Sequence, residues 1–78
     1  MPYIKVKAYP KDKAIKEKVA DEIQVIFEKY WGCASEAISV SFEEVSPSDW
    51  QSEVVEKEIQ PNVAEMLVLN GEKVNRND

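Results

Sequence analysis

The second residue of the chain is a proline, and a proline at an exposed N-terminus is a chemically unusual group. The sequence begins Met1-Pro2-Tyr3, so removal of the initiator methionine would leave a secondary amine held in a ring. A free α-amine titrates near pH ~8, and partial burial lowers its pKa because burial disfavours the charged form. Such a base is suited to moving a proton at a carbon next to a carbonyl group. The alternative is that Met1-Pro2 is an ordinary start with no chemical role.

Lysines follow this proline closely, although the chain as a whole is acidic. The formal net charge is −5, yet residues 1–18 hold six lysines and two acids, a net charge of +4. The other sixty residues carry a net charge of −9. A cationic region beside a reactive amine can attract an anionic substrate. The alternative is a solvated, lysine-rich surface.

Hydrophobic periodicity predicts the elements that position these residues. Residues 2–9 alternate as in a strand, residues 13–31 have the spacing of an amphipathic helix, and residues 35–44 alternate again. Pro10 ends the first strand because it lacks an N–H group, and Gly32 suits the end of the helix. A strand, a helix and a second strand predict a β-α-β unit with parallel strands and a right-handed crossover.

The alternation also predicts which face of the two strands the helix covers. Asp12 is expected to cap the start of that helix. The covered face should carry Ile4, Val6, Val40 and Phe42. The opposite face should be polar and carry Lys5, Lys7, Ser39 and Ser41.

The remaining third of the chain predicts a second helix. Residues 46–49 have the composition of a turn and cap, and residues 50–59 have a partial apolar stripe. Pro61 should kink or restart this helix, and Asn70-Gly71 predicts a turn. We expect a single domain over residues 1–78, with a loosely ordered tail from about residue 70.

Composition excludes several kinds of site and partner. Cys33 is the only cysteine and there is no histidine, so we expect no disulfide within the chain, no metal site and no cofactor. We interpret Cys33 as a small buried residue without a redox role. The acidic net charge argues against nucleic acid, and no run of about 18 apolar residues is present to span a membrane. A cytoplasmic protein is the expectation.

A chain of 78 residues with two strands needs further burial to be stable. Small domains bury a modest share of their surface, and two strands leave unpaired edges. A second copy can pair with such an edge across a twofold axis. We therefore expect a homodimer with a four-stranded sheet. A higher oligomer is the alternative, and the polar face disfavours it.

Several segments occur in an order that is typical of one known family. They are Pro2-x-Ile4-x-Val6, the helix through Ile15 and Ile26, residues 37–44, and Ser48-Asp49-Trp50. Over about residues 2–66 the chain resembles the 4-oxalocrotonate tautomerase family of the tautomerase superfamily. It is most similar to the short dimeric tautomerases that have phenylpyruvate-type enol–keto activity. The resemblance implies an α+β fold, in which a β-α-β unit is followed by a C-terminal helix and dimerisation completes the sheet.

The resemblance also implies roles for individual residues. Pro2 takes the family's role of general base and acid. The family's two substrate-binding arginines fall where this chain has Lys11-Asp12 and Ser39, so Lys11 and Ser39 are the candidates for substrate binding. Lys11 offers a point charge without the two-pronged geometry of arginine. Trp50 matches the family's apolar wall, although an ordinary core or interface aromatic is the alternative for that residue.

These features predict an isomerase that interconverts the enol and keto forms of a small 2-keto or unsaturated carboxylate. A monocarboxylate with an apolar or aromatic group fits the missing arginines best. One alternative is a hydratase or dehalogenase of the same superfamily. Another is a noncatalytic, oligomeric binding module on the same scaffold.

Overall fold

The computed structural model describes residues 1–77, which divide into two compact units. The first unit spans Met1–Ser46, and the second begins at Pro47. No helix within residues 1–77 is long and apolar enough to cross a membrane. The single domain over residues 1–78 stays a prediction.

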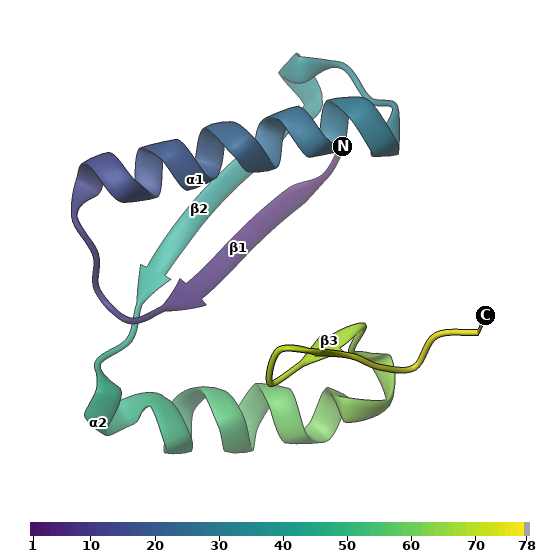
Figure 1. Ribbon diagram of the computed structural model, residues 1–78. Coiled ribbons are helices and arrows are strands. Elements are labelled where there is room, and N and C mark those ends of the chain that lie inside the picture. Colours follow the sequence, from purple (N-terminus) through teal and green to yellow (C-terminus); the bar gives the residue numbers. More distant parts are fainter. Residues whose placement is uncertain (78) are drawn as a thin grey trace. The chain divides into compact units, whose positions relative to one another are not determined.

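The first unit is built from two parallel strands and one helix (Figure 1). Strand β1 spans Tyr3–Ala8, helix α1 spans Lys13–Ile26, and strand β2 spans Ser39–Glu44. The strands pair in parallel, with Tyr3 opposite Ser39 and Ala8 opposite Glu44. This arrangement confirms the predicted α+β fold with a β-α-β unit.

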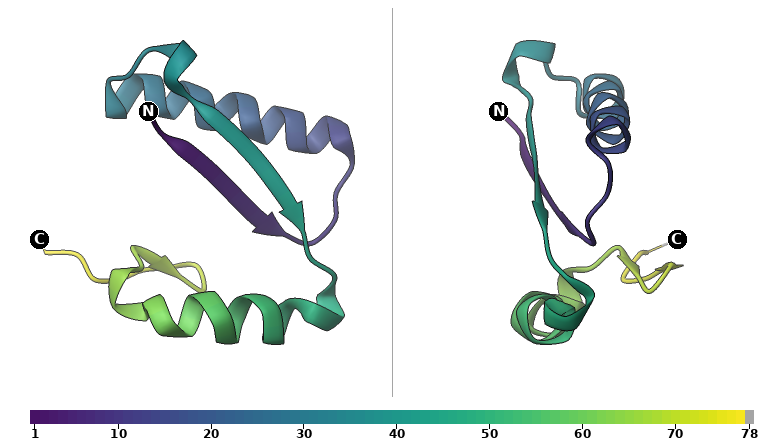
Figure 2. Two further views of the ribbon diagram at one scale, coloured as in Figure 1. Left: turned by 180° about the vertical axis from the view of Figure 1, so that it is seen from behind. Right: turned by 90° about the vertical axis from the view of Figure 1, so that its left-hand side faces the viewer.

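Helix α1 covers one face of the two strands, as the right-hand view of Figure 2 shows. The side chains of Val6, Ala8 and Phe42 line a cleft together with Ile15 and Val19 of the helix. Residues two positions apart on a strand share a face, so the alternation in the sequence selects this apolar side. The predicted location of the helix is therefore confirmed.

The opposite face of the strands is polar. The hydroxyl groups of Tyr3 and Ser41 share a hydrogen bond of 2.8 Å between the two strands. The Lys5 Nζ atom lies 2.7 Å from the Glu43 Oε1 atom, and both side chains are almost half exposed. Exposed pairs of this kind contribute little to stability, so they mark a solvated face rather than a core.

The ends of α1 lie where the sequence predicts them, with two differences in detail. Asp12 precedes the helix and its carbonyl accepts the N–H groups of Ile15 and Lys16 at 3.1 Å, but its side chain makes no capping hydrogen bond. After Ile26 the helix continues as a wider π-helical turn, Phe27–Trp31. Gly32 then ends it with φ 75°, a left-handed conformation that glycine adopts easily.

The second strand is shorter than the alternation predicts. Residues 35–37 form a 3₁₀ turn, and β2 begins at Ser39. The amide of Gln24 in α1 donates to the Ser35 hydroxyl at 2.9 Å, which ties this turn to the helix. The prediction of a strand from residue 35 is wrong because residues 35–37 form a turn that hydrogen-bonds to the helix instead of to the neighbouring strand.

The second unit begins with helix α2, Pro47–Trp50. It is followed directly by the π-helical turns Gln51–Ile59 and the 3₁₀ turns Gln60–Glu65. The backbone departs from helical angles at Asn62, directly after Pro61, which confirms the predicted kink. Proline lacks the N–H group that a continuous helix needs.

A hairpin follows this helix. Strand β3, Val68–Leu69, pairs antiparallel with β4, Glu72–Lys73. Asn70 and Gly71 between them have φ 50° and 83°, which is typical of a tight hairpin turn. The predicted turn is confirmed, whereas the two short strands are not predicted by the sequence pattern.

The segment after the hairpin has defined hydrogen-bond partners. The Asn75 side-chain amide donates to the carbonyls of Val63 and Met66, at 2.9 and 2.8 Å. The Arg76 Nε atom donates to the Leu67 carbonyl at 3.2 Å. These contacts differ from the loose tail expected from about residue 70, because side-chain-to-backbone hydrogen bonds leave no hydrophobic pattern in the sequence.

Candidate active site

Pro2 lies immediately before β1 and is fixed to the neighbouring strand. Its carbonyl accepts the N–H group of Ser39 at 3.1 Å, and its side chain is partly buried. Met1 precedes it and is 99% exposed. While Met1 is attached, the Pro2 nitrogen is an amide without basicity; once Met1 is removed, it is a secondary amine on a rigid strand.

Ser39 is therefore close to Pro2 along the backbone, but its side chain belongs to a different face. Ser39 lies opposite Tyr3 in the register, and residues paired in this way share a face. Pro2 precedes Tyr3 and so shares the face of Ile4 and Val6. The structure brings the two backbones together and places the Ser39 side chain on the polar side.

Lys11 lies at the other end of β1. Its backbone N–H donates to the Glu44 Oε2 atom at 3.0 Å, which places it beside the last residue of β2. The six residue steps from Pro2 to Ala8 extend over roughly 20 Å at the usual rise of a strand. Pro2 and Lys11 of one chain are thus too far apart to hold one small substrate.

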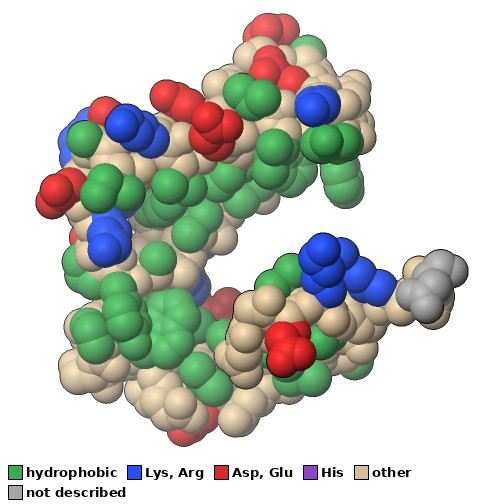
Figure 3. All heavy atoms as spheres, viewed as in Figure 1, with side chains coloured by type: hydrophobic (Ala, Val, Ile, Leu, Met, Phe, Trp, Pro, Cys, Tyr) green, Lys and Arg blue, Asp and Glu red, His purple; other side chains and the backbone are tan. Residues whose placement is uncertain are grey.

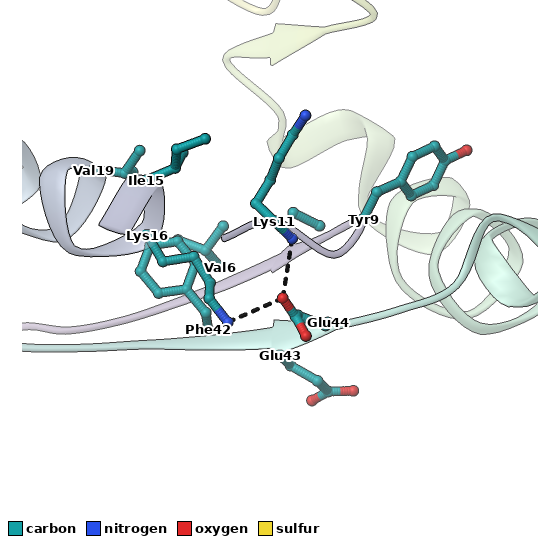
Figure 4. Close-up of a pocket in the computed structure, with 10 residues that line it drawn as sticks. Val6, Tyr9, Lys11, Ile15, Lys16, Val19, Phe42, Glu43 and Glu44 are labelled. Atoms are coloured by element: carbon teal, nitrogen blue, oxygen red, sulfur yellow. Dashed lines mark hydrogen bonds and ion pairs between the residues drawn. The ribbon is translucent and has the colours of Figure 1, made fainter. Parts of the chain in front are cut away.

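The cleft between α1 and the sheet lies at this Lys11 end (Figure 4). It has a volume of about 160 Å³. Its walls are largely apolar, and the polar residues that line it are Tyr9, Lys11, Lys16, Glu43 and Glu44. The cleft is small, and its combination of apolar walls with cations at the edge is that of a site for a compact molecule with an apolar group and a carboxylate.

Glu44 connects the loop and the helix at the edge of this cleft. Its Oε2 atom accepts the Lys16 ammonium at 2.9 Å and the Lys11 N–H at 3.0 Å (Figure 4). The hydrogen bond from Lys16, followed by that from the Lys11 backbone, holds the pKa of the Glu44 carboxyl below its ordinary value. The sequence reasoning missed Glu44 and Lys16. The available signal was that Glu44 continues the apolar alternation of Val40 and Phe42, where a charge needs a partner.

The polar face has a similar ion pair, between Lys5 and Glu43, which also shifts the pKa values of its members. The hydrogen bond between Lys5 and Glu43 raises the pKa of Lys5 and lowers the pKa of Glu43. In Figure 4 the Glu43 side chain points away from the cleft. Glu43 and Glu44 are thus neighbours in sequence with similar ion pairs on opposite faces.

Trp50 is the last residue of α2 in the second unit and is partly buried. Pro2, Lys11 and Ser39 all belong to the first unit. The assignment of Trp50 to an apolar wall of the site stays a prediction.

A second hollow lies at the end of α1. It is lined by Ile26, Phe27, Tyr30 and Trp31, and the rings of Phe27 and Trp31 lie 5.5 Å apart. Tyr30 and Trp31 are 77% and 70% exposed, and Figure 3 shows hydrophobic side chains gathered around this helix. The nearby Cys33 thiol is partly buried and lies 3.7 Å from the Phe27 carbonyl.

Comparison with known proteins identifies relatives over most of the chain. No protein-family model matches the sequence. Three curated proteins named Tautomerase PptA align with 65 residues, which cover 81% of this chain and 86% of each relative. They come from Pectobacterium atrosepticum, Pectobacterium carotovorum and Cronobacter sakazakii, and they are 34%, 32% and 37% identical to this chain.

Proposed function

The chain belongs to the 4-oxalocrotonate tautomerase family of the tautomerase superfamily, and we propose that it is an isomerase that uses Pro2 as its proton carrier. The observation that supports this best is the location of Pro2. It is partly buried, it is fixed to β2 through Ser39, and it is preceded by one highly exposed methionine. After removal of Met1 the secondary amine would lie at the start of a rigid strand, which is a suitable place for a general base.

The proposed reaction is a proton transfer without net change in composition. The neutral Pro2 amine takes the proton from the enol hydroxyl or from the carbon beside the carbonyl. The resulting ammonium then returns a proton to the other atom, which leaves the amine neutral again. A cation or hydrogen-bond donor near the oxygen stabilises the negative charge that develops there. Lys11 and the Tyr9 hydroxyl are the groups around the cleft that can take this role.

In this proposal Pro2 and Lys11 act on the same substrate, and the distance between them therefore favours a site shared by two copies. Within residues 1–77, β1 pairs with β2 alone, so its other edge is open to a second β1. In an antiparallel pair, residues that lie opposite each other share a face. With the twofold axis near the middle of β1, Pro2 falls opposite Ala8 or Pro10 of the partner copy. Pro2 of one copy then lies beside the cleft and the Lys11 of the other.

The apolar surface of the chain supports the same homodimer. Val45 and Val54 are the buried hydrophobic residues found within residues 1–77. Large apolar side chains remain exposed along α1, including Ile15, Val19, Val25 and Ile26. Surface of this kind favours association. The polar pairs Tyr3–Ser41 and Lys5–Glu43 on the opposite face favour a dimer over a hexamer that would bury them.

The cleft favours a small substrate with one carboxylate. Its volume of about 160 Å³ and its apolar walls suit a 2-keto acid with an aromatic or branched group. Lys11 would bind the carboxylate. Ser39 contributes its backbone N–H, which holds Pro2, while its side chain lies on the polar face; Trp50 stays a predicted apolar contact. We propose neither nucleic acid nor a cofactor as a partner of this dimer. Its cytoplasmic location stays a prediction.

The test is enol–keto conversion of phenylpyruvate by protein whose intact mass shows that Met1 is absent. Pro2→Ala replaces the ring amine by a primary amine and should lower kcat/KM, whereas complete loss of a positioned general base costs about 10²–10⁴-fold. A form with leucine inserted between Met1 and Pro2 keeps the nitrogen blocked and should be inactive. Equal rates for all three proteins would remove Pro2 from the mechanism. Failure to convert any enol substrate, with dimerisation intact, would favour the noncatalytic binding module.

A further inference from the structure

We propose that Glu44 determines the substrate class of the cleft by holding the Lys16 ammonium. Lys11 and Lys16 are the cations that line the cleft. With Lys16 engaged, Lys11 is the cation that remains for a substrate, so the cleft selects monocarboxylates over dicarboxylates. This inference rests on the proposed function, because it concerns the substrate of that same site.

Glu44 owes its position to the register of the sheet. It is the last residue of β2 and shares the α1-facing side with Val40 and Phe42. Its Oε2 atom accepts two hydrogen bonds, one from the Lys16 side chain and one from the Lys11 backbone. The carboxylate therefore binds the Lys16 ammonium of the helix and also holds the loop that carries Lys11.

The two lysines differ in what holds them. The Lys16 side chain is 30% exposed and is bound to Glu44 at 2.9 Å. Lys11 is held through its backbone, and its ammonium has no hydrogen bond or ion pair within the part of the chain that the structure describes. In Figure 4 the Lys11 side chain extends away from Glu44. Lys11 is thus anchored near the cleft with its charge unpaired.

A substrate with a second carboxylate meets two obstacles at this edge. It has to replace Glu44 as the partner of Lys16, and its own charge lies near that of the Glu44 carboxylate. Replacing Glu44 by glutamine removes both obstacles and keeps an oxygen that can accept the Lys11 N–H. Because exposed ion pairs contribute modestly, the released cation should change relative affinities by about two- to fivefold.

The experiment compares two unreactive probes, phenylacetate and 1,4-phenylenediacetate, which differ in one carboxymethyl group. Their dissociation constants are measured by NMR titration at low ionic strength, where the Debye length is long. Glu44→Gln should shift the affinity ratio about two- to fivefold toward the dicarboxylate. The double variant Glu44→Gln/Lys16→Gln should lose this shift. Glu43→Gln removes the neighbouring ion pair on the opposite face and should leave the ratio unchanged.

The outcomes separate this inference from the proposed reaction. An unchanged ratio in Glu44→Gln, an equal shift in Glu43→Gln, or no binding of either probe would overturn the role of Glu44. If these occur while phenylpyruvate is still converted, the inference fails and the reaction stands. If the ratio shifts as expected but no enol is converted, the charge selection stands and the reaction fails.

Discussion

Mixing two damaged variants tests whether each active site is shared between two copies. Pro2→Ala replaces the proposed ring amine by a primary amine that the ring no longer holds in place, and Lys11→Ala lacks the proposed carboxylate contact. Each homodimer should be impaired, Lys11→Ala by about 10- to 100-fold in kcat/KM, which is the usual contribution of a hydrogen bond to a charged group. If Pro2 and Lys11 of one site come from different copies, a mixed dimer contains one site with both residues intact.

The expected recovery follows from counting sites. After unfolding and refolding at equal concentrations, half of the dimers are mixed, and one of their two sites is complete. The mixture should therefore have about one quarter of the wild-type kcat/KM, well above either parent. The separation of roughly 20 Å between Pro2 and Ala8 along one strand is the structural reason for expecting this.

Lys18→Ala is the matched control for this experiment. Lys18 lies on α1 and has no assigned role at the cleft. Mixing it with Pro2→Ala should give about half of the wild-type activity, since half of the Pro2 residues are intact. If the mixture of Pro2→Ala with Lys11→Ala shows no more activity than the average of its two parents, the shared site is refuted.

Three further changes test the fold and the site. Trp50→Ala should raise KM for enol-phenylpyruvate by about tenfold, because loss of an aromatic contact with the substrate costs about 1–1.5 kcal/mol. Trp50→Phe keeps an aromatic ring and should stay near wild type. Unchanged KM in both variants would indicate that Trp50 has a structural role. Gly32→Ala should lower the free energy of unfolding, measured in urea, by about 1–2 kcal/mol because φ is 75° at this position. A Cβ atom there meets nothing within 4 Å, so a steric clash does not contribute. Gly32→Asn should lower the free energy of unfolding by less, and equal stability of all three proteins would contradict the left-handed cap. The pKa values of Glu43 and Glu44 are lowered in the folded protein. Their contribution to the free energy of unfolding should be complete above the ordinary carboxyl pKa of ~4.3 and should be lost as the pH falls through the lowered values. In urea titrations Glu43→Gln and Glu44→Gln should lose less stability at acid pH than the wild type does, and curves parallel to wild type would argue against these ion pairs in solution.

The β-α-β unit could be predicted because its signals are local and repeat. Alternation with period two identified the face of Val6 and Phe42, and helical spacing identified the side of α1 that meets it. Pro10 and Gly32 end their elements for reasons that hold in any chain. The same rules failed at residues 35–37, where alternating residues satisfy a strand pattern although the segment forms a 3₁₀ turn.

The candidate site was predicted in part. Pro2 and Lys11 follow from the order of the sequence, and the resemblance to a known family supplied their roles. Their separation along β1 appears only when the strand and the loop are placed in three dimensions. The pairing of Glu44 with Lys16 joins residues 28 positions apart, and no periodic pattern encodes such a contact.

The hairpin of the second unit had a weaker signal still. Asn70-Gly71 predicted the turn, but strands of two residues have too few positions for alternation to be visible. The hydrogen bonds of Asn75 and Arg76 run to backbone carbonyls, which exist in every residue. The residue types along the sequence therefore do not indicate which carbonyl groups these side chains will contact.

The central claim is that the proton carrier is the amine of Pro2, and a direct titration of that nitrogen tests it. Protein labelled with ¹⁵N and shown by mass to lack Met1 is titrated by NMR, and kcat/KM is measured over the same pH range. We expect one midpoint for both curves, at or below pH ~8, with activity rising as the amine loses its proton. Two distinct midpoints, or full activity in protein that still carries Met1, would contradict it.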